Sequence, residues 1–408
     1  MADSRPTILV VVHVYPDNGG IAAIVENLVA LLKSRAEVHL AIVDQRPDAA
    51  ERVGLKADRL HVLGHHRLAN ALLMPGSIVF ATRTTRWLRE VLAEVSPEIV
   101  IVQDALDLPI PAVLAVRGTG AKLAIMDHGT LSNVLDRRWQ RMMRERLGLL
   151  RGSVFWLGFQ LDAPWRALRW RLGLRACDGA WYVGHELADR FKWAGAKARR
   201  YTQMVPVDFR PPGPGEREAA RARLGLGRDA VVVNLVTRLD PEKNLRDVLD
   251  ATQNVLRLQS RLQLVIGGDG TLYDWLEREL ERRDLTARVW LLGRVSRLDI
   301  QQLHHASDFH LYAGVIGCGM SIALLEAMSC GVIPIVSDVP REHRELVAHS
   351  GWVFHAGDWS ALRDALAEAV TAPSERLAEL RTAVGHRLES YNSPLLPQLV
   401  DELLSGAA

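Results

Sequence analysis

The residues best suited to chemistry lie in a loop that follows a buried strand pattern in the second half of the chain. The aliphatic run Ala230–Val236 is followed by the sequence TRLDPEKN and then by a helical pattern. Arg238 and Lys243 place two cations at a helix N-terminus, where the dipole disfavours positive charge unless an anion lies between them. A planar guanidinium and a mobile ammonium suit the oxygens of a diphosphate. The loop is therefore a candidate phosphate site; the alternative is an internal ion pair of Arg238 with Asp240 or Glu242.

The most specific stretch runs from Gly317 to Pro334. Glycines precede a short helical pattern, and Gly331 stands where a helix C-cap is expected. Glu326 lies partway along this helix among leucine, alanine and methionine, where an isolated carboxylate is costly to bury. Two vicinal hydroxyl groups, as on a ribose, would satisfy it by donating to both oxygens. The alternative is a partly exposed glutamate on an amphipathic helix.

Three further candidates also follow strand patterns. Gly19 and Gly20 precede a helix, where backbone N–H groups can approach an anion closely. Gly268 lies in another strand-to-helix turn, where backbone can line a nucleotide pocket. His128 follows a strand and would face the same edge of a sheet. The alternatives are turns without a ligand and a structural histidine. The early turn lacks the G-x-G-x-x-G spacing, so a nicotinamide-binding fingerprint is not supported.

These loops require strands and helices that alternate along the chain. Strand patterns occur at Thr7–Val14, Glu37–Val43, Leu60–Leu63, Ile99–Gln103, Lys122–Met126 and Ala180–Val183, and again at Ala230–Val236, Leu262–Ile266, Val289–Leu291, Phe309–Tyr312 and Val332–Val336. Such alternation predicts an α/β fold with parallel, doubly wound sheets.

The stretch RPPGPG at residues 210–215 is typical of a linker. It predicts two Rossmann-like domains, residues 1–209 and 216–385, that face each other across a cleft. Residues 386–408 are expected to form a helical tail that packs back toward the first domain.

Length, composition and cysteine content argue against a single small domain, a zinc-binding protein and a membrane-spanning protein. A chain of 408 residues is long enough for two domains of roughly 200 residues each, and its net charge of +2 is close to neutral. The three cysteines fit no zinc pattern, so a reduced, cytoplasmic setting is the simplest interpretation. The first residues do not resemble a signal peptide, and no apolar run approaches the roughly 20 residues of a membrane span.

Residues 137–175 have an unusual composition. This segment holds ten arginines, no lysine, four tryptophans and two acids, which gives it a net charge of +8. Basic side chains mixed with aromatic ones are typical of helices that lie on anionic lipid. We therefore expect peripheral binding to a membrane surface, on the cytoplasmic face, with a lipid-linked acceptor within reach. The alternatives are a segment that packs on its own domain with solvated arginines, and nucleic-acid binding, which no recognised motif supports.

Taken in order along the chain, these motifs resemble glycosyltransferase family 4. The resemblance rests on the Gly-Gly turn, His-Gly at residues 128–129, the Arg…Glu-Lys-Asn loop, Gly-Asp-Gly at residues 268–270 and Glu-Ala-Met…Gly-x-x-Pro at residues 326–334. It implies the two-domain fold called GT-B and a retaining mechanism. It also implies a nucleotide-sugar co-substrate, a UDP-sugar or a GDP-sugar, bound mainly by the C-terminal domain with no metal or other cofactor.

The resemblance implies a role for each candidate residue. Arg238 and Lys243 would hold the diphosphate and stabilise the leaving charge, and Glu326 would receive the ribose hydroxyls. Other contacts to the donor would come from the backbone at Gly319, Met320 and Ser321, from Gly20 beside Gly19, and from His128. No enzymic nucleophile is implied, because the acceptor would attack on the face that the nucleotide leaves.

One departure from the family pattern concerns the donor sugar. The family carries a glutamate eight residues before the position of Glu326, and Cys318 stands there in this chain. A thiol is a weak hydrogen-bond partner and does not replace a carboxylate. The sequence thus predicts a hexosyl-transferring enzyme for a glycan or lipid-linked acceptor in cell-surface polysaccharide or glycolipid synthesis. The alternatives are a catalytically weak or silent binding subunit and a nucleotide-sugar epimerase.

Overall fold

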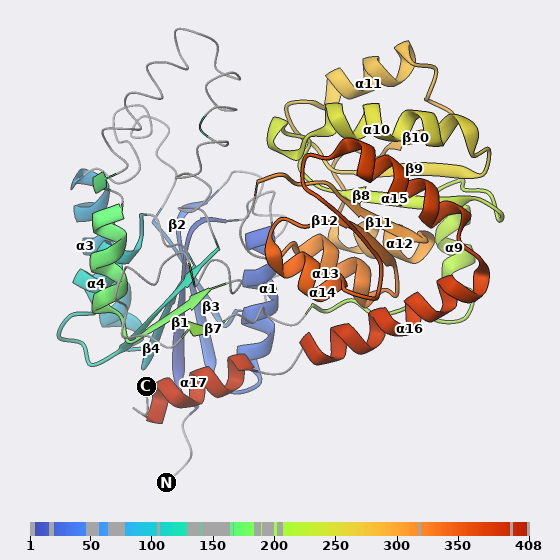
Figure 1. The fold of residues 1–408 in the computed structure, drawn as a ribbon. Helices are drawn as coiled ribbons and strands as arrows, with labels where there is room; N and C mark the ends of the chain where they lie inside the picture. The colour runs from blue at the N-terminus through green and yellow to red at the C-terminus, as the bar shows by residue number, and fades with distance from the viewer. Residues whose placement is uncertain are drawn as a thin grey trace, which may run out of the picture. The chain divides into compact units, whose positions relative to one another are not determined.

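The chain divides into two compact units in the computed structural model (Figure 1). Unit 1 comprises Met1–Pro206 and Pro394–Ala408, and unit 2 comprises Val207–Ser393. The structure describes residues 5–15, 20–45, 57–63, 78–103, 107–128, 140, 164–165, 167–182, 189, 200–201, 207–316, 320–391 and 395–405. No helix within these ranges is both long enough and apolar enough to cross a membrane.

Unit 1 is built on a parallel sheet with the strand order β3-β2-β1-β4-β5-β6-β7. Its strands are β1 (Thr7–Tyr15), β2 (Glu37–Gln45), β3 (Arg59–Val62), β4 (Ile99–Val102), β5 (Lys122–Asp127), β6 (Gly179–Tyr182) and β7 (Arg200–Tyr201). The aliphatic sequence of β4 is buried along its whole length, as expected for a strand covered on both faces.

Helices flank this sheet between its strands. Among the described residues these are α1 (Gly20–Lys33), α3 (Ile78–Val95) and α4 (Pro109–Val116), and α17 (Leu395–Ser405) joins them from the C-terminal part of the chain. Residues 164–165 and 167–176 are also helical. The last helix joins unit 1 by side-chain contact, since Arg35 Nη1 donates to Asp401 Oδ2 at 3.1 Å.

Unit 2 repeats the same topology with the strand order β10-β9-β8-β11-β12-β13, again parallel. Its strands are β8 (Val231–Val236), β9 (Leu262–Gly267), β10 (Val289–Leu291), β11 (Phe309–Tyr312), β12 (Ile333–Ser337) and β13 (Trp352–Phe354). Its helices are α9 (Glu216–Arg223), the 3₁₀ turn η3 (Pro241–Lys243), α10 (Leu245–Leu258), α11 (Tyr273–Arg282), α12 (Arg297–Ala306), α13 (Ile322–Ser329), α14 (Arg341–Val347), α15 (Trp359–Thr371) and α16 (Ser374–Tyr391).

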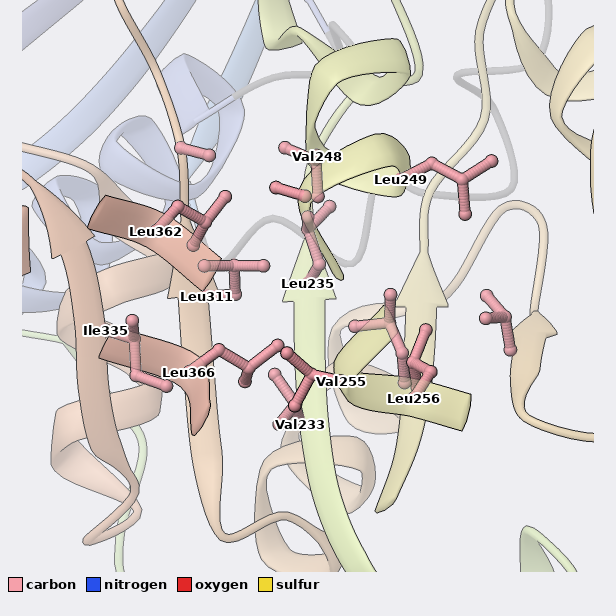
Figure 2. Packing of buried hydrophobic residues seen from close by; sticks show 14 of the residues in the cluster. Val233, Leu235, Val248, Leu249, Val255, Leu256, Leu311, Ile335, Leu362 and Leu366 are labelled. Carbon is pink, nitrogen blue, oxygen red and sulfur yellow. The ribbon is translucent and has the colours of Figure 1, made fainter. Parts of the chain in front are cut away.

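Both faces of the second sheet are covered. Val233 and Leu235 of β8 pack with residues of α10 and α15 in one cluster, which Figure 2 shows. The alternate residue Val232 faces a second cluster that contains Leu303 of α12 and Ala220 of α9. Because successive strand residues point to opposite faces, this alternation is what a doubly wound sheet requires.

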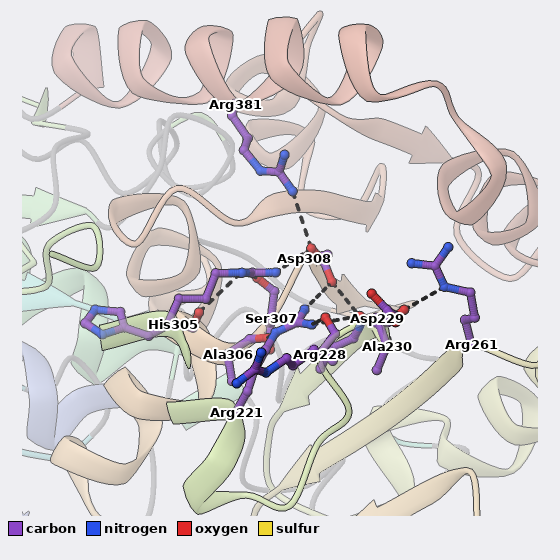
Figure 3. A network of polar contacts seen from close by, with 12 residues as sticks. Arg221, Arg228, Asp229, Ala230, Arg261, His305, Ala306, Ser307, Asp308 and Arg381 are labelled. Carbon is purple, nitrogen blue, oxygen red and sulfur yellow. Dashed lines mark hydrogen bonds and ion pairs between the residues drawn. The ribbon is translucent and has the colours of Figure 1, made fainter. Parts of the chain in front are cut away.

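A partly buried carboxylate joins several elements at the amino end of the unit 2 sheet. Asp308 precedes β11 and accepts hydrogen bonds from Arg217 Nη2 at 2.6 Å, from Arg221 Nη2 at 2.8 Å and from the Val232 N–H at 2.9 Å. Arg381 of α16 reaches the same carboxylate at 3.4 Å, so helices from both ends of unit 2 meet there (Figure 3). This charged cluster lies at the opposite end of the strands from the loops considered below, and its connections are structural.

The predicted α/β fold with two doubly wound sheets is confirmed, and the differences are small. Two short strands were missed: β7 spans two residues, and the three residues of β13 follow Gly351 without the long aliphatic run that marks the central strands. Residues 210–215 form no helix or strand, but they belong to unit 2, where Glu216 accepts from both Arg210 and the Gly213 N–H. Helix α16 continues to Tyr391, and the chain returns to unit 1 only from Pro394.

Candidate functional site

The candidate loops of unit 2 lie at the carboxyl ends of β8, β9 and β11. The order of strands reverses between β8 and β11, since the chain moves outward through β9 and β10 on one side and through β12 and β13 on the other. In open α/β sheets, ligands bind at the carboxyl edge beside such a reversal. The topology therefore directs the Arg238 loop and the start of α13 toward a common edge.

The loop after β8 is organised by Asp240. Its Oδ2 accepts from Arg238 Nη1 at 2.7 Å, and its Oδ1 accepts from the Thr271 N–H at 3.2 Å and hydroxyl at 2.9 Å. The Asp240 side chain is largely buried, whereas that of Arg238 is 45% exposed. The internal ion pair weighed as an alternative is thus present. Since a guanidinium has five N–H donors, this pair orients Arg238 without using all its donors.

Glycines hold the next loop directly against the Arg238 loop. A Cβ on Gly268 would lie 1.8 Å from the Thr237 carbonyl oxygen, and one on Gly270 would lie 2.6 Å from the Leu239 carbonyl oxygen. The Leu239 N–H donates to the Asp269 carbonyl at 3.0 Å, which ties the two loops together on either side of Arg238. In this structure Gly268 packs backbone against backbone, so its observed contact supports the position of Arg238.

Lys243 ends the 3₁₀ turn η3, and Asn244 follows it in a left-handed conformation with φ of 53°. The Asn244 side chain donates from Nδ2 to the Ala313 carbonyl after β11 at 3.3 Å. Asparagine tolerates this backbone region and can bond locally, which explains the Lys-Asn pair at the turn. The residue after Lys243 thus ties this loop to the end of β11, and the charge of Lys243 contributes to the lowered pKa of His343.

His343 connects this cationic loop with the start of α13. Its Nε2 accepts the Ser321 N–H at 3.1 Å, and its ring stands at 85° to that of Tyr312, with centroids 4.4 Å apart. Burial, followed by the charges of His310 and Lys243, lowers the pKa of His343 to about 3. The ring is therefore neutral near pH 7 and keeps the lone pair on Nε2 that receives the amide proton.

Ser321 and Met320 begin the helix that carries Glu326. Ser321 is the N-cap of α13, and its Oγ accepts the Leu324 N–H at 3.4 Å. The Ser321 amide, which the family resemblance directs to the donor, is bonded to His343 in this structure. In this structure the amide proton of Ser321 already has an acceptor, so a donor contact from Ser321 would come from its hydroxyl.

Glu326 is buried, with 5% of its side chain exposed, and it has a charged partner. Arg297, the first residue of α12, donates from Nη1 to Glu326 Oε1 at 2.9 Å. The Arg297 guanidinium also lies over the Phe209 ring, 4.7 Å from its centroid. The alternative of a partly exposed glutamate is therefore wrong, and a charged partner for Glu326 comes from a different helix.

The remaining candidates lie in unit 1 or outside the described residues. Gly20 is the first residue of α1, and His128 follows β5. Nε2 of His128 donates to Gln103 Oε1 at 2.9 Å, which leaves Nδ1 as the acceptor in the neutral imidazole. Gly19, Cys318 and Gly319 fall outside the described residues. Within the described ranges, no group of three or more His, Cys, Asp or Glu side chains is arranged to hold a metal ion.

Most of unit 2 resembles proteins of known family. Residues 216–386 match the family model for glycosyl transferases group 1. Among curated relatives, the D-inositol 3-phosphate glycosyltransferase of Stackebrandtia nassauensis is 30% identical over 199 residues, which covers 44% of each chain. The chain spans less than half the length of the curated relatives that it matches.

Solved structures resemble the whole chain. Anabaena Alr3699/HepE, solved with UDP-glucose, has a TM-score of 0.70 at 15% identity and covers 98% of this chain and 99% of its own. Sucrose-phosphate synthase from Thermosynechococcus elongatus has a TM-score of 0.74 at 14% identity, with 98% and 100% covered. At such identities the likeness concerns the fold, which is the two-domain GT-B fold predicted from the sequence.

Sequence reasoning missed Arg297 and His343. Arg297 lies 29 positions before Glu326 in a helix start with several charged residues, and no local spacing distinguishes it. His343 lies three residues after Pro340, in a helical pattern with no unusual feature. Both contacts depend on how α12 and α14 pack beside α13, which is information that only the three-dimensional structure contains.

Proposed function

We propose that this protein is a retaining glycosyltransferase that transfers a hexose from a nucleoside diphosphate sugar to a glycan or lipid-linked acceptor. The observation that carries the proposal is the topology of unit 2, in which the loop with Arg238 and Lys243 follows β8 and the segment that leads to α13 follows β11, on the two sides of the reversal in strand order. Both segments fall within the residues that match the glycosyl transferase family model. The family match does not favour the epimerase or the silent-subunit alternative.

The diphosphate is assigned to Arg238 and Lys243. Asp240 orients the Arg238 guanidinium, and Lys243 ends η3 in the same loop. Two fixed cations and the positive end of a helix stabilise the charge that develops on the leaving diphosphate. These groups are in place before the reaction, so little reorganisation is needed when the sugar departs. The proposed chemistry therefore requires no metal ion.

We assign the nucleoside to the part of α13 that carries Glu326. The ion pair with Arg297 offsets the cost of burying the carboxylate, while a carboxylate has about four acceptor positions and can also receive ribose hydroxyls. The Ser321 hydroxyl and the Met320 backbone are the proposed neighbours of the phosphate or the sugar. Gly19, Gly20 and Gly319 are proposed to make the donor contacts that the family resemblance implies. Cys318 stands at a donor-sugar position of the family pattern, where its thiol does not replace the family's carboxylate.

The proposed reaction keeps the configuration of the anomeric carbon. The acceptor oxygen attacks on the face from which the diphosphate leaves, the bond from the anomeric carbon to the phosphate oxygen breaks, and that phosphate oxygen takes the acceptor proton. His128 is the proposed contact for the donor sugar from unit 1, with its ring held by Gln103. The GDP-sugar and UDP-sugar alternatives remain as predicted, and the UDP-glucose complex of HepE supports testing UDP-sugars first.

The acceptor is proposed to belong to cell-surface polysaccharide or glycolipid synthesis at the cytoplasmic face of a membrane. Support comes from the basic, tryptophan-rich residues 137–175. Relatives include D-inositol 3-phosphate glycosyltransferases and, at lower identity, a phosphatidylinositol N-acetylglucosaminyltransferase subunit. These are activities of the relatives, and they suggest inositol-containing acceptors as the first ones to test with this protein.

A panel of UDP-sugars and GDP-sugars tests the proposal. The full-length protein is incubated with each donor and with a crude lipid and glycan extract, and proton NMR follows the anomeric signal of donor and product. We expect one donor to give a product with the same anomeric configuration. Inversion would contradict the retaining mechanism. Conversion of a donor to another free sugar nucleotide without an acceptor would instead identify an epimerase.

A further inference from the structure

Three large apolar side chains are exposed along one helical segment of unit 1. Residues 164–165 and 167–176 are helical, and Trp165, Leu168 and Leu172 are 65%, 44% and 49% exposed. At about 100° per residue, these three side chains lie within roughly 60° of one another around the helix. Together they form one continuous surface, which we call the Trp165 stripe.

The opposite side of the same segment is fixed to unit 1. Trp170 and Leu174 are fully buried, and a Cβ on Gly173 would lie 2.4 Å from Pro109 Cβ at the start of α4. This segment and the start of α4 therefore lie side by side in unit 1, in close contact at Gly173 (Figure 1). This packing determines the orientation of the segment and leaves the Trp165 stripe facing outward.

Arginines flank the stripe on both sides. By the same helical spacing, Arg169 follows the stripe on one side, and Arg175 and Arg171 follow it on the other. An outward apolar stripe that contains tryptophan and is bordered by arginines is the pattern of a helix that lies in a bilayer interface. A helix that only covers its own domain would bury its apolar stripe. Here the buried side carries Trp170 and Leu174, and the Trp165 stripe is exposed.

An arginine-lined pocket adjoins the stripe. It has a volume of about 780 Å³ and lies between α3, α4 and Arg169. Arg86 and Arg89 of α3 line it with Arg169, against the single carboxylate of Glu90 in the described lining. Its apolar wall includes Leu114, which is itself 41% exposed, and Arg89 Nη2 donates to the Leu114 carbonyl at 3.1 Å.

The chemistry of this pocket fits a phosphate that carries apolar chains. Guanidinium groups bind phosphate oxygens through paired N–H donors, and the excess of arginine over acid makes the pocket positive. The exposed leucines and tryptophan beside it supply the apolar surface that acyl chains would cover. A small soluble phosphate would use the arginines but would leave the Trp165 stripe in water.

We infer that unit 1 docks on an anionic phospholipid bilayer through this face. The Trp165 stripe and Leu114 enter the interface, and the pocket formed by Arg86, Arg89 and Arg169 takes a lipid phosphate. This deepens the proposed function by naming the face that meets the membrane of a lipid-linked acceptor. It rests on unit 1 alone, so it is testable without any donor or acceptor.

Vesicle flotation of the full-length protein tests this inference. The vesicles are phosphatidylcholine with or without phosphatidylglycerol, at low salt. We expect the wild-type protein to float with the phosphatidylglycerol vesicles. A triple variant Trp165→Ser, Leu168→Ser, Leu172→Ser should lose binding on the order of tenfold or more, because its apolar contact is removed. The double variant Arg86→Gln, Arg89→Gln should lose the preference for phosphatidylglycerol.

Matched controls come from unit 2, where Leu258 and Leu298 are 82% and 61% exposed. The double variant Leu258→Ser, Leu298→Ser should float like the wild type, and thermal melting checks that every variant is folded. Wild-type protein that stays with the unbound fraction, or a stripe variant that floats normally, would overturn the inference. So would a stripe-dependent dimer or a stripe-dependent complex with RNA that forms without vesicle binding. Nucleotide binding measured on the same proteins reports the proposed transferase site separately.

Discussion

The Glu326 carboxylate accepts a hydrogen bond from the Arg297 guanidinium, with Oε1 and Nη1 2.9 Å apart. The pair joins α12 to α13, which is the helix proposed to bind the nucleotide. It also explains how a carboxylate is buried among Leu324, Leu325 and Met328 without an unpaired charge.

Breaking this pair from one side should destabilise unit 2. Arg297→Met leaves the buried carboxylate without this cation, at a cost of about 1–3 kcal/mol, reduced from that of a fully buried pair because Arg297 is one-third exposed. The double variant Arg297→Met, Glu326→Gln removes the charge as well and should regain much of the loss. Urea denaturation measures both. If the double variant is no more stable than Arg297→Met, the pair is not what neutralises Glu326.

His343 should act as a positioning residue through its Nε2 lone pair. His343→Gln offers an amide oxygen to the Ser321 N–H, whereas His343→Leu leaves that part-buried N–H without its acceptor, a cost of about 1–3 kcal/mol. We expect weaker UDP or GDP binding for His343→Leu and partial rescue for His343→Gln, with both variants folded. Calorimetry provides the comparison. Equal affinities for the two variants would show that the accepted hydrogen bond does not position the helix start.

The buried histidines of unit 2 should make its stability fall as the pH is lowered. Burial lowers the pKa of His310 and of His343 to about 3 and holds that of His304 well below its ordinary value. The unfolded chain takes up the protons of His310 and His343 below about pH 6.5, while the folded chain does so only near pH 3. As the pH falls through this window, each of these two histidines therefore lowers the free energy of unfolding by about 1.4 kcal/mol per pH unit.

His343→Gln isolates one contribution to this pH dependence. Between about pH 6 and pH 4, the free energy of unfolding of the variant should fall less steeply than that of the wild type, by about 1.4 kcal/mol per pH unit. Urea titrations at several pH values measure the two slopes. Parallel curves would mean that His343 is protonated in the folded protein.

A methyl group at Gly268 should displace the Arg238 loop. The new Cβ would lie 1.8 Å from the Thr237 carbonyl oxygen, so Gly268→Ala forces the two loops apart and should weaken diphosphate binding as well as lower the melting temperature. Gly385→Ala is the matched control, because α16 has open space there and alanine favours a helix by about 0.5–1 kcal/mol. Unchanged nucleotide binding in Gly268→Ala would contradict the proposed support of Arg238.

The sequence predicted the sheets well because central parallel strands are continuous aliphatic runs. The run at Ile99–Val102 is an example, whereas β13 is a short edge strand with no such signal. The loops at the strand ends could be found from residue types, since arginine, lysine and glycine clusters interrupt the pattern. The partners of those residues could not. Asp240 could pair with Arg238 by proximity, but Arg297 and His343 reach α13 only through helix packing.

The central claim is that Arg238 and Lys243 bind the diphosphate of the donor. Calorimetry of the full-length protein with UDP, GDP and UMP tests it most directly, using Arg238→Gln, Lys243→Gln and, as a control, Arg257→Gln at the far end of α10. We predict that UDP or GDP binds more tightly than the monophosphate. Each loop variant should lose about 1.5–3 kcal/mol of that binding, while Arg257→Gln should lose none. Affinities that are unchanged in both loop variants would contradict the account.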